Sequence, residues 1–191
     1  VAGRVGRWVG LATLGAALLL PACTILPKAE PLEVYLLPAT ATATSSASAT
    51  RAAPWSLRVA RPAAGVHLSG QRIVVVPADN RVSVYTGAGW SDPAPVLVRN
   101  RLLDGFARDG RVTLLSTDDS NFAADLELGG SLQAFQTEYQ GTQASVVVRV
   151  DALLVRGYDQ KILASRRFEE RQPLNDVQVP AVVAGFAGVQ T

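Results

Sequence analysis

Residues 144–157 read ASVVVRVDALLVRG, and this stretch decides the fold expected for the chain. Apolar residues recur at every second position, and successive side chains of a strand point to opposite faces of a sheet. Arg149 and Asp151 share one face. The other face carries an apolar row of Val146, Val148, Val150, Ala152 and Leu154. The pattern predicts a long strand that faces a core on one side and solvent on the other.

The neighbouring segments predict an antiparallel meander around this strand. The pair Gly129–Gly130 indicates a bulge or bend. After a tight turn at YDQ, residues 161–171, KILASRRFEER, return as a hairpin partner, and their crowded charges favour a solvated edge strand over a docking patch. Residues 124–135, ADLELGGSLQAF, predict the strand that precedes 144–157. Four of its apolar residues are expected to share one face: Leu126, Leu128, Leu132 and Ala134.

The first half of the chain predicts shorter strands. These segments are compact apolar runs or alternate between apolar and polar residues. TGAG at 86–89 indicates a turn. The expected strands lie at 33–38, 55–62, 72–78, 81–87 and 111–117.

Residues 90–110, WSDPAPVLVRNRLLDGFARDG, predict the longest helix. Ser91 or Asp92 can cap it, Pro93 suits its first turn and Gly110 ends it. A second helix is expected from Val179. The whole pattern predicts a single domain of the α/β or α+β class, over residues 33–191, with a mixed sheet of about six to seven strands and two principal helices.

The N-terminal residues 1–22 have the three parts of a secretory signal peptide: two arginines, an apolar run and small residues before Cys23. The run from Val9 to Ala22 has 14 residues, fewer than the about 20 that a membrane-spanning helix needs. Leu20-Pro21-Ala22-Cys23 resembles the bacterial lipobox, in which cleavage precedes the cysteine and the new terminus is acylated. We therefore expect lipid attachment at Cys23. The alternative is an ordinary signal peptide followed by a buried cysteine.

Cleavage there would change the charge of the protein. The chain carries 18 basic and 16 acidic residues, and removing Arg4 and Arg7 leaves 16 of each. The basic pI of about 9.0 thus belongs to the targeting segment, and no basic run indicates nucleic acid. A single cysteine excludes a disulfide within the chain.

The segment between Cys23 and the domain determines how far the domain can lie from a membrane. Residues 23–32 are expected to form a tether, and residues 39–54, rich in alanine, threonine and serine, a flexible loop. If residues 33–38 pair into the sheet, the nine residues 24–32 reach at most roughly 30 Å. If they do not, the tether extends to Pro54. We expect pairing.

Catalytic patterns are lacking in the sequence. His67 is the only histidine, so no two-histidine metal site can form, and no G-x-S-x-G elbow or phosphate loop is present. STDDSNF at 116–122 lacks the glycine and distal glutamate of a calcium loop, so turn chemistry explains Asp118 and Asp119 more simply. We expect no metal, no cofactor and no enzymatic activity.

Three motifs carry a resemblance to a known family: YLLP at 35–38, DNR at 79–81 and GWSDPAPVLVRNRLLDGF at 89–106. With the lipobox they resemble the ABC-type transport auxiliary lipoproteins, the PqiC-like group. The resemblance implies an outer-membrane lipoprotein that faces the periplasm. It would carry three acyl chains, palmitate among them, and work with an MCE-domain protein and an ABC transporter in lipid traffic that supports membrane integrity. Thr24 in place of aspartate also favours the outer membrane, by analogy with the sorting rule of enteric bacteria. The long Ala/Thr/Ser stretch departs from the family pattern.

Two aromatic residues are candidates for partner binding. Tyr85 and Trp90 flank the predicted glycine turn, and exposed aromatics often anchor interfaces. The alternative for Trp90 is that it packs the start of the helix on the sheet. Two other functions stay open: a periplasmic lipid carrier with its own apolar pocket, and a structural envelope-assembly lipoprotein. Self-association is also left open.

Overall fold

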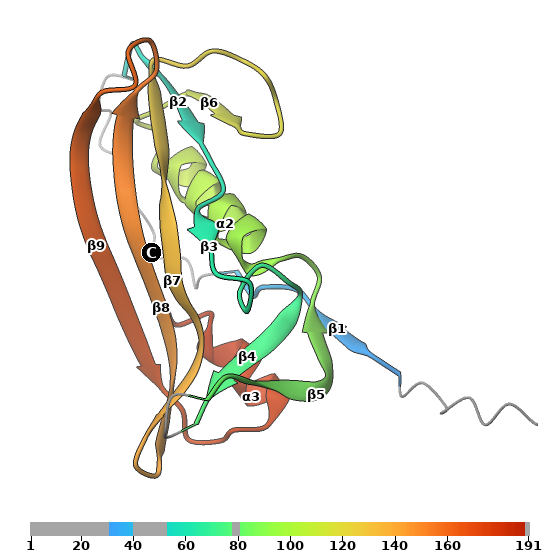
Figure 1. The fold of residues 1–191 in the computed structure, drawn as a ribbon. Helices are drawn as coiled ribbons and strands as arrows, with labels where there is room; N and C mark the ends of the chain where they lie inside the picture. Colours follow the sequence, from blue (N-terminus) through green and yellow to red (C-terminus); the bar gives the residue numbers. More distant parts are fainter. Residues whose placement is uncertain (1–30, 40–52, 78–80, 190–191) are drawn as a thin grey trace, which may run out of the picture. The chain divides into compact units, whose positions relative to one another are not determined.

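The computed structural model describes residues 31–39, 53–77 and 81–189. The expected signal peptide, Cys23 and most of the tether and of the 39–54 loop lie outside these ranges. Within them the chain forms one mixed sheet and two helices (Figure 1). The elements are β1 (Glu33–Tyr35), β2 (Ser56–Val59), β3 (Ala63–Ala64), β4 (Arg72–Val76), β5 (Ser83–Trp90), α2 (Ala94–Asp109), β6 (Leu114–Thr117), β7 (Leu126–Gln140), β8 (Gln143–Arg156), β9 (Ile162–Pro173) and α3 (Val179–Gly185).

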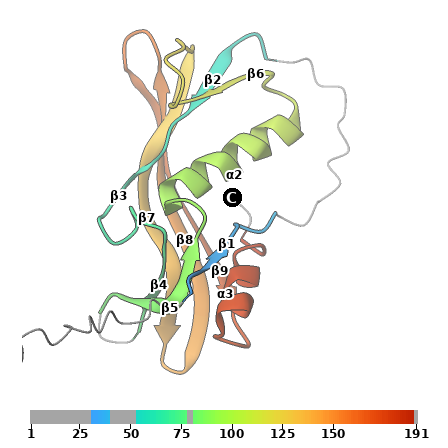
Figure 2. The same ribbon diagram turned by 90° about the vertical axis from the view of Figure 1, so that its right-hand side faces the viewer.

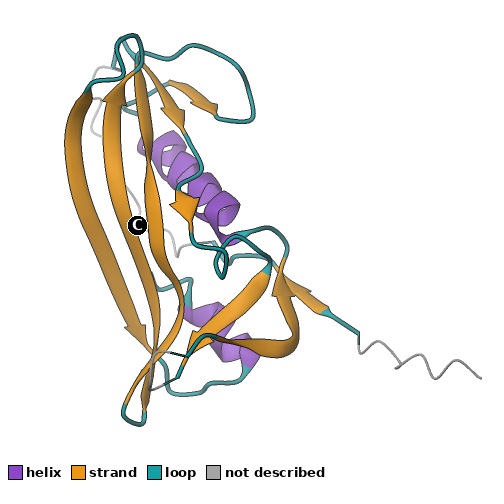
Figure 3. Ribbon diagram, in the orientation of Figure 1, coloured by secondary structure: helices purple, strands orange, loops and turns teal. Residues whose placement is uncertain are grey.

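The long antiparallel strands β7, β8 and β9 form the predicted meander (Figure 3). On β8 the expected apolar row faces the core, with Val146, Val148 and Val150 between 0% and 8% exposed. The charges occupy the opposite face, where Arg149 pairs with Glu169 and Asp151 with Arg167. β9 pairs only with β8 among the described strands, so the prediction of a charged edge strand is confirmed.

Short strands line the other edge of β7. β2, β3 and β4 each pair in parallel with β7, at successive positions along it. β6 pairs with the far side of β2. β5 pairs with β4, and β1 pairs with β5. The described sheet therefore has nine strands, more than the six to seven expected. The two-residue β3 is too short to show any periodicity in the sequence. The predicted α+β class is confirmed.

Both helices lie on the same face of the sheet (Figure 2). α2 begins after Pro93, and no side chain caps it, so Ser91 and Asp92 do not have the capping role expected of them. Gly110 ends the helix in the left-handed conformation, with φ of 72°, and its N–H donates to the Phe106 carbonyl. α3 confirms the second predicted helix.

The glycine turn predicted at 86–89 is wrong, because β5 continues through it to Trp90. Gly87 has φ of 70°, and the pairing with β4 shifts register between Arg72 and Val74. Glycine at these positions serves a β-bulge instead of reversing the chain.

A second bulge changes the apolar face of β7. The register with β8 shifts between Leu132 and Ala134, so that Leu132 lies opposite Val150 and Phe135 opposite Val148. One extra residue reverses the faces of all that follow. Phe135 therefore joins the helix-side core, and the expectation that Ala134 shares a face with Leu132 is wrong.

Candidate functional site

An apolar groove of about 430 Å³ lies between α2 and the long strands. Its walls come from one face of the helix, from the helix-side face of β7 and β8, and from the exposed edge strand β9. The lining residues are Val98, Leu102, Gly105, Phe106, Asp109, Arg111, Leu128, Val148, Val150, Ala152, Phe168 and Glu170. Nine of these twelve residues carry no charge, and the groove falls within the size range of small-molecule sites, about 300–1,000 Å³.

The burial of α2 changes along its length, because Val98 belongs to the main core while Leu102 and Phe106 pack against a second cluster around Leu57 and Val59. Val98, near the start of the helix, is 2% exposed, whereas Leu102 and Phe106 further along are half-buried. Gly105 lies between them, and a Cβ built on it would meet nothing within 4 Å. Protein interiors are close-packed and have few voids larger than a water molecule. An apolar space of this size is therefore a feature to explain.

Charged residues stand at the borders of the groove. Beyond the end of α2, the Nε of Arg111 donates to Asp109 at 2.6 Å and lowers the pKa of that carboxyl group. On β9 the guanidinium of Arg166 lies 5.0 Å from the centre of the Phe168 ring, which is 48% exposed. The groove thus combines an apolar floor with a polar, solvated border.

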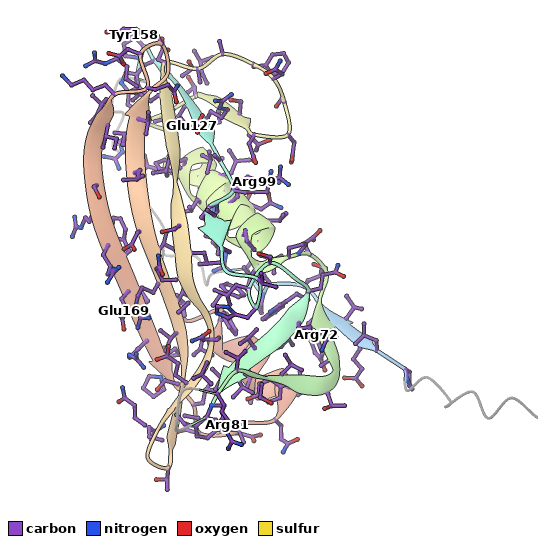
Figure 4. All side chains as sticks on the ribbon, in the orientation of Figure 1. Arg72, Arg81, Arg99, Glu127, Tyr158 and Glu169 are labelled. Atoms are coloured by element: carbon purple, nitrogen blue, oxygen red, sulfur yellow. The ribbon has the colours of Figure 1, made fainter. Side chains whose placement is uncertain are left out.

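The opposite face of the long strands is polar and internally paired. Arg149 holds Glu169 at 2.7 Å and lowers the pKa of Glu169 to about 2, and Arg171 bridges to Glu138. Figure 4 shows Glu169 on β9, away from Arg99 on the helix side of the sheet. The apolar groove lies on the helix side, so that side carries the candidate site.

The aspartates of the acidic cluster at 116–122 form ion pairs with arginines. Arg99, with a side chain 6% exposed, lies 2.7 Å from both Asp118 and Asp119, and Arg61 lies 2.6 Å from Asp118. Burial raises the pKa of Asp118, but the hydrogen bonds from Arg99 and Arg61 outweigh it and lower this pKa to about 2. No group of three metal-binding side chains occurs among the described residues. These ion pairs join α2 to the segment after β6.

The two aromatic candidates lie in different environments. Trp90 is 1% exposed and packs edge-to-face on Phe135 and Phe186, with ring centres 5.7 and 5.1 Å away. Its ring offers no surface to a partner, and the arrangement favours the alternative, that it packs the start of the helix on the sheet.

Tyr85 is half-buried. Burial raises the pKa of its hydroxyl, and the nearby Thr137 hydroxyl lowers it by less. His67 is exposed in its loop.

The N-terminal strand is tied to the domain, as expected for residues 33–38. β1 runs parallel to β5 with Tyr35 opposite Trp90, and the Ser91 N–H donates to the Tyr35 carbonyl at 2.8 Å. Arg101 of α2 donates to the Pro38 carbonyl. Neither described helix is long and apolar enough to cross a membrane.

An apolar groove of this size with a few charged groups at its border has the composition of a ligand site. Residues 35–190 match the family described as the ABC-type transport auxiliary lipoprotein component, and the chain belongs to this family. The resemblance seen in the sequence motifs is thereby confirmed. Membership associates the chain with the cell envelope, as a lipoprotein accessory to ABC-type transport.

Individual proteins are similar to this chain in sequence or in fold. A protein from Xanthomonas campestris, of the DUF330 family, is 26% identical, with a TM-score of 0.71 over 81% of this chain and 86% of that one. A second, uncharacterised structure shares the fold, with a TM-score of 0.61 at 19% identity over 83% of this chain and 90% of that one. An uncharacterised protein of Bradyrhizobium diazoefficiens is 30% identical over 132 residues, 69% of this chain. The match spans only 35% of that relative's length.

Proposed function

We propose that this chain is an outer-membrane lipoprotein that faces the periplasm and serves as an accessory component of an MCE/ABC-type intermembrane lipid transport system. The observation that carries the proposal is the family match over residues 35–190, in a chain whose residues Leu20–Cys23 also resemble a lipobox. The role is one of attachment and binding. No catalytic step is assigned to any residue.

Attachment would occur through acyl chains on Cys23. Each buried methylene group contributes about 0.8 kcal/mol, and a single chain binds a membrane only marginally, so a durable anchor needs two or more. Acylation of a lipobox cysteine supplies three. Thr24 in the following position supports sorting to the outer membrane.

The domain would lie close to the membrane surface. Because β1 begins at Glu33, residues 24–32 form the whole tether in this proposal, with a reach of at most roughly 30 Å. Three exposed apolar side chains at this end, Leu32, Val34 and Leu36, support a position near lipid, with exposed fractions of 62%, 61% and 75%.

One of the two alternative functions gains support. A lipid carrier requires an apolar pocket within the domain, and the groove beneath α2 supplies one. Lipid binding and an accessory role in transport are compatible. Tyr85 stays a proposed contact for the MCE partner.

The proposal is tested by purification of the chain, tagged at its C-terminus, from cross-linked and detergent-solubilised membranes of its own bacterium. Mass spectrometry is expected to find an MCE-domain protein and an ABC permease enriched over a purification of an unrelated tagged outer-membrane lipoprotein. Enrichment of neither protein would contradict the proposed partnership.

A further inference from the structure

We propose that the groove beneath α2 binds one acyl chain of a phospholipid, with the headgroup in solvent beside Arg111. The inference rests on the proposed function and deepens it, since it assigns a lipid site to this chain itself. It is carried by the shape, the lining and the borders of the groove.

The shape suits a chain. From Val98 to Asp109 the helix rises about 16 Å, and these residues line the groove along its length. Water occupies about 30 Å³ per molecule in the liquid, and a methylene group is similar in size, so 430 Å³ holds about fourteen such groups. A space of this capacity and length can hold a long unbranched hydrocarbon.

The lining suits the same ligand. Leu102 and Phe106 line the groove from the helix, and Val148, Val150 and Ala152 line it from the sheet. The charged lining residues are Asp109, Arg111 and Glu170, and Glu170 lies opposite Val148 in the β8–β9 pair. Burying apolar surface contributes about 25 cal/mol per Å². The half-exposed Leu102, Phe106 and Phe168 would lose their contact with water when a chain enters.

The border at Arg111 suits a phosphate. Its side chain is 68% exposed, and only its Nε donates to Asp109 in a described ion pair. The guanidinium fork matches phosphate oxygens bidentately. A protein segment is a poorer occupant, because a helix with its side chains is about 10–12 Å wide and the space already lies between a helix and a sheet.

Gly105 offers a sharp test, because its substitution separates filling of the groove from damage to the fold. Gly105→Leu places a side chain in open space on the groove face and also raises helix propensity. Ala107→Leu adds a similar bulk on the exposed side of α2 and serves as the matched control. Both full-length variants are expected to melt at or above the wild-type temperature.

The measurement is photo-cross-linking in phosphatidylethanolamine vesicles that contain a phospholipid with a photoreactive group in its acyl chain. The wild type and Ala107→Leu are expected to carry adducts on groove residues, and Gly105→Leu roughly tenfold fewer. A parallel sample with the free photoreactive fatty acid is expected to label the groove less. Stronger labelling by the fatty acid would overturn the choice of phospholipid.

Equal labelling of Gly105→Leu and Ala107→Leu, or adducts only outside the groove, would overturn the site. If Gly105→Leu does not fold, Phe168→Glu replaces it, because Phe168 is 48% exposed on the edge strand and the new carboxylate faces the groove. The same roughly tenfold loss is expected. Copurification of the MCE protein without groove labelling would leave the transport role standing and remove only this inference.

Discussion

Replacement of Gly130 by alanine is expected to destabilise the domain by more than about 3 kcal/mol, enough to prevent folding in a protein of ordinary stability. Gly130 has φ of 130°, a conformation that residues with a Cβ rarely adopt. A Cβ built there would lie 1.9 Å from the Asp151 carbonyl oxygen on the paired strand β8. Relief of this clash would separate β7 from β8, the two strands that form the floor of the groove. Urea denaturation followed by circular dichroism measures the change.

The neighbouring glycine is the control for this prediction. A Cβ on Gly129 would meet its nearest atom, the Ala60 Cβ, at 3.8 Å, which is ordinary van der Waals contact. Gly129→Ala is therefore expected to change the free energy of unfolding by less than about 1 kcal/mol. Equal losses in the two variants would show that the strand needs glycine at both positions for another reason.

Replacement of Cys23 by serine is expected to remove the protein from the outer membrane entirely. Serine lacks the sulfur that receives the diacylglyceryl group, and the acyl chains supply the proposed anchor. The measurement is density-gradient separation of inner and outer membranes with immunodetection of the protein. Intact mass of the wild type is expected to show a chain that begins at an acylated Cys23.

Thr24→Ser is the matched control for Cys23→Ser, because it adds a serine one residue away and keeps the cysteine. It is expected to remain in the outer membrane. If Cys23→Ser were found in the outer membrane in the wild-type amount, the anchor would have to lie elsewhere in the protein.

The elements that the sequence predicted best are those with long local periodicity. The alternation on β8 extends over many residues, so its buried face could be assigned from the chain alone. The bulges were harder to place. Gly129–Gly130 indicated a bulge or bend, but the pairing with β8 is regular there, and the register shift lies after Leu132 and brings Phe135 into the core. Gly87 and Gly89 are as compatible with a turn as with a bulge in the sequence, and only the pairing of β5 with β4 shows that the strand continues.

The groove could not be predicted, because it depends on the distance between a helix and a sheet. The half-buried Leu128 and Ala152 look the same in the sequence whether or not a helix covers them fully. Phe168 is flanked by charged residues on β9, so nothing in the sequence indicates that it lines a groove. Gly105 in the interior of α2 was the one local signal, since glycine weakens a helix and calls for a packing or functional reason. The environment of Trp90 could not be predicted either, because a tryptophan in the core and a tryptophan at an interface can have the same local sequence.

In the proposed function, this chain takes part in lipid transport between the two membranes of the envelope. The most direct test of this role is the rate at which newly labelled phospholipid equilibrates between inner and outer membrane in cells that lack the gene. We expect slower equilibration in these cells, restored by the wild-type protein and not by the Cys23→Ser variant. Equal rates in all three strains would contradict it.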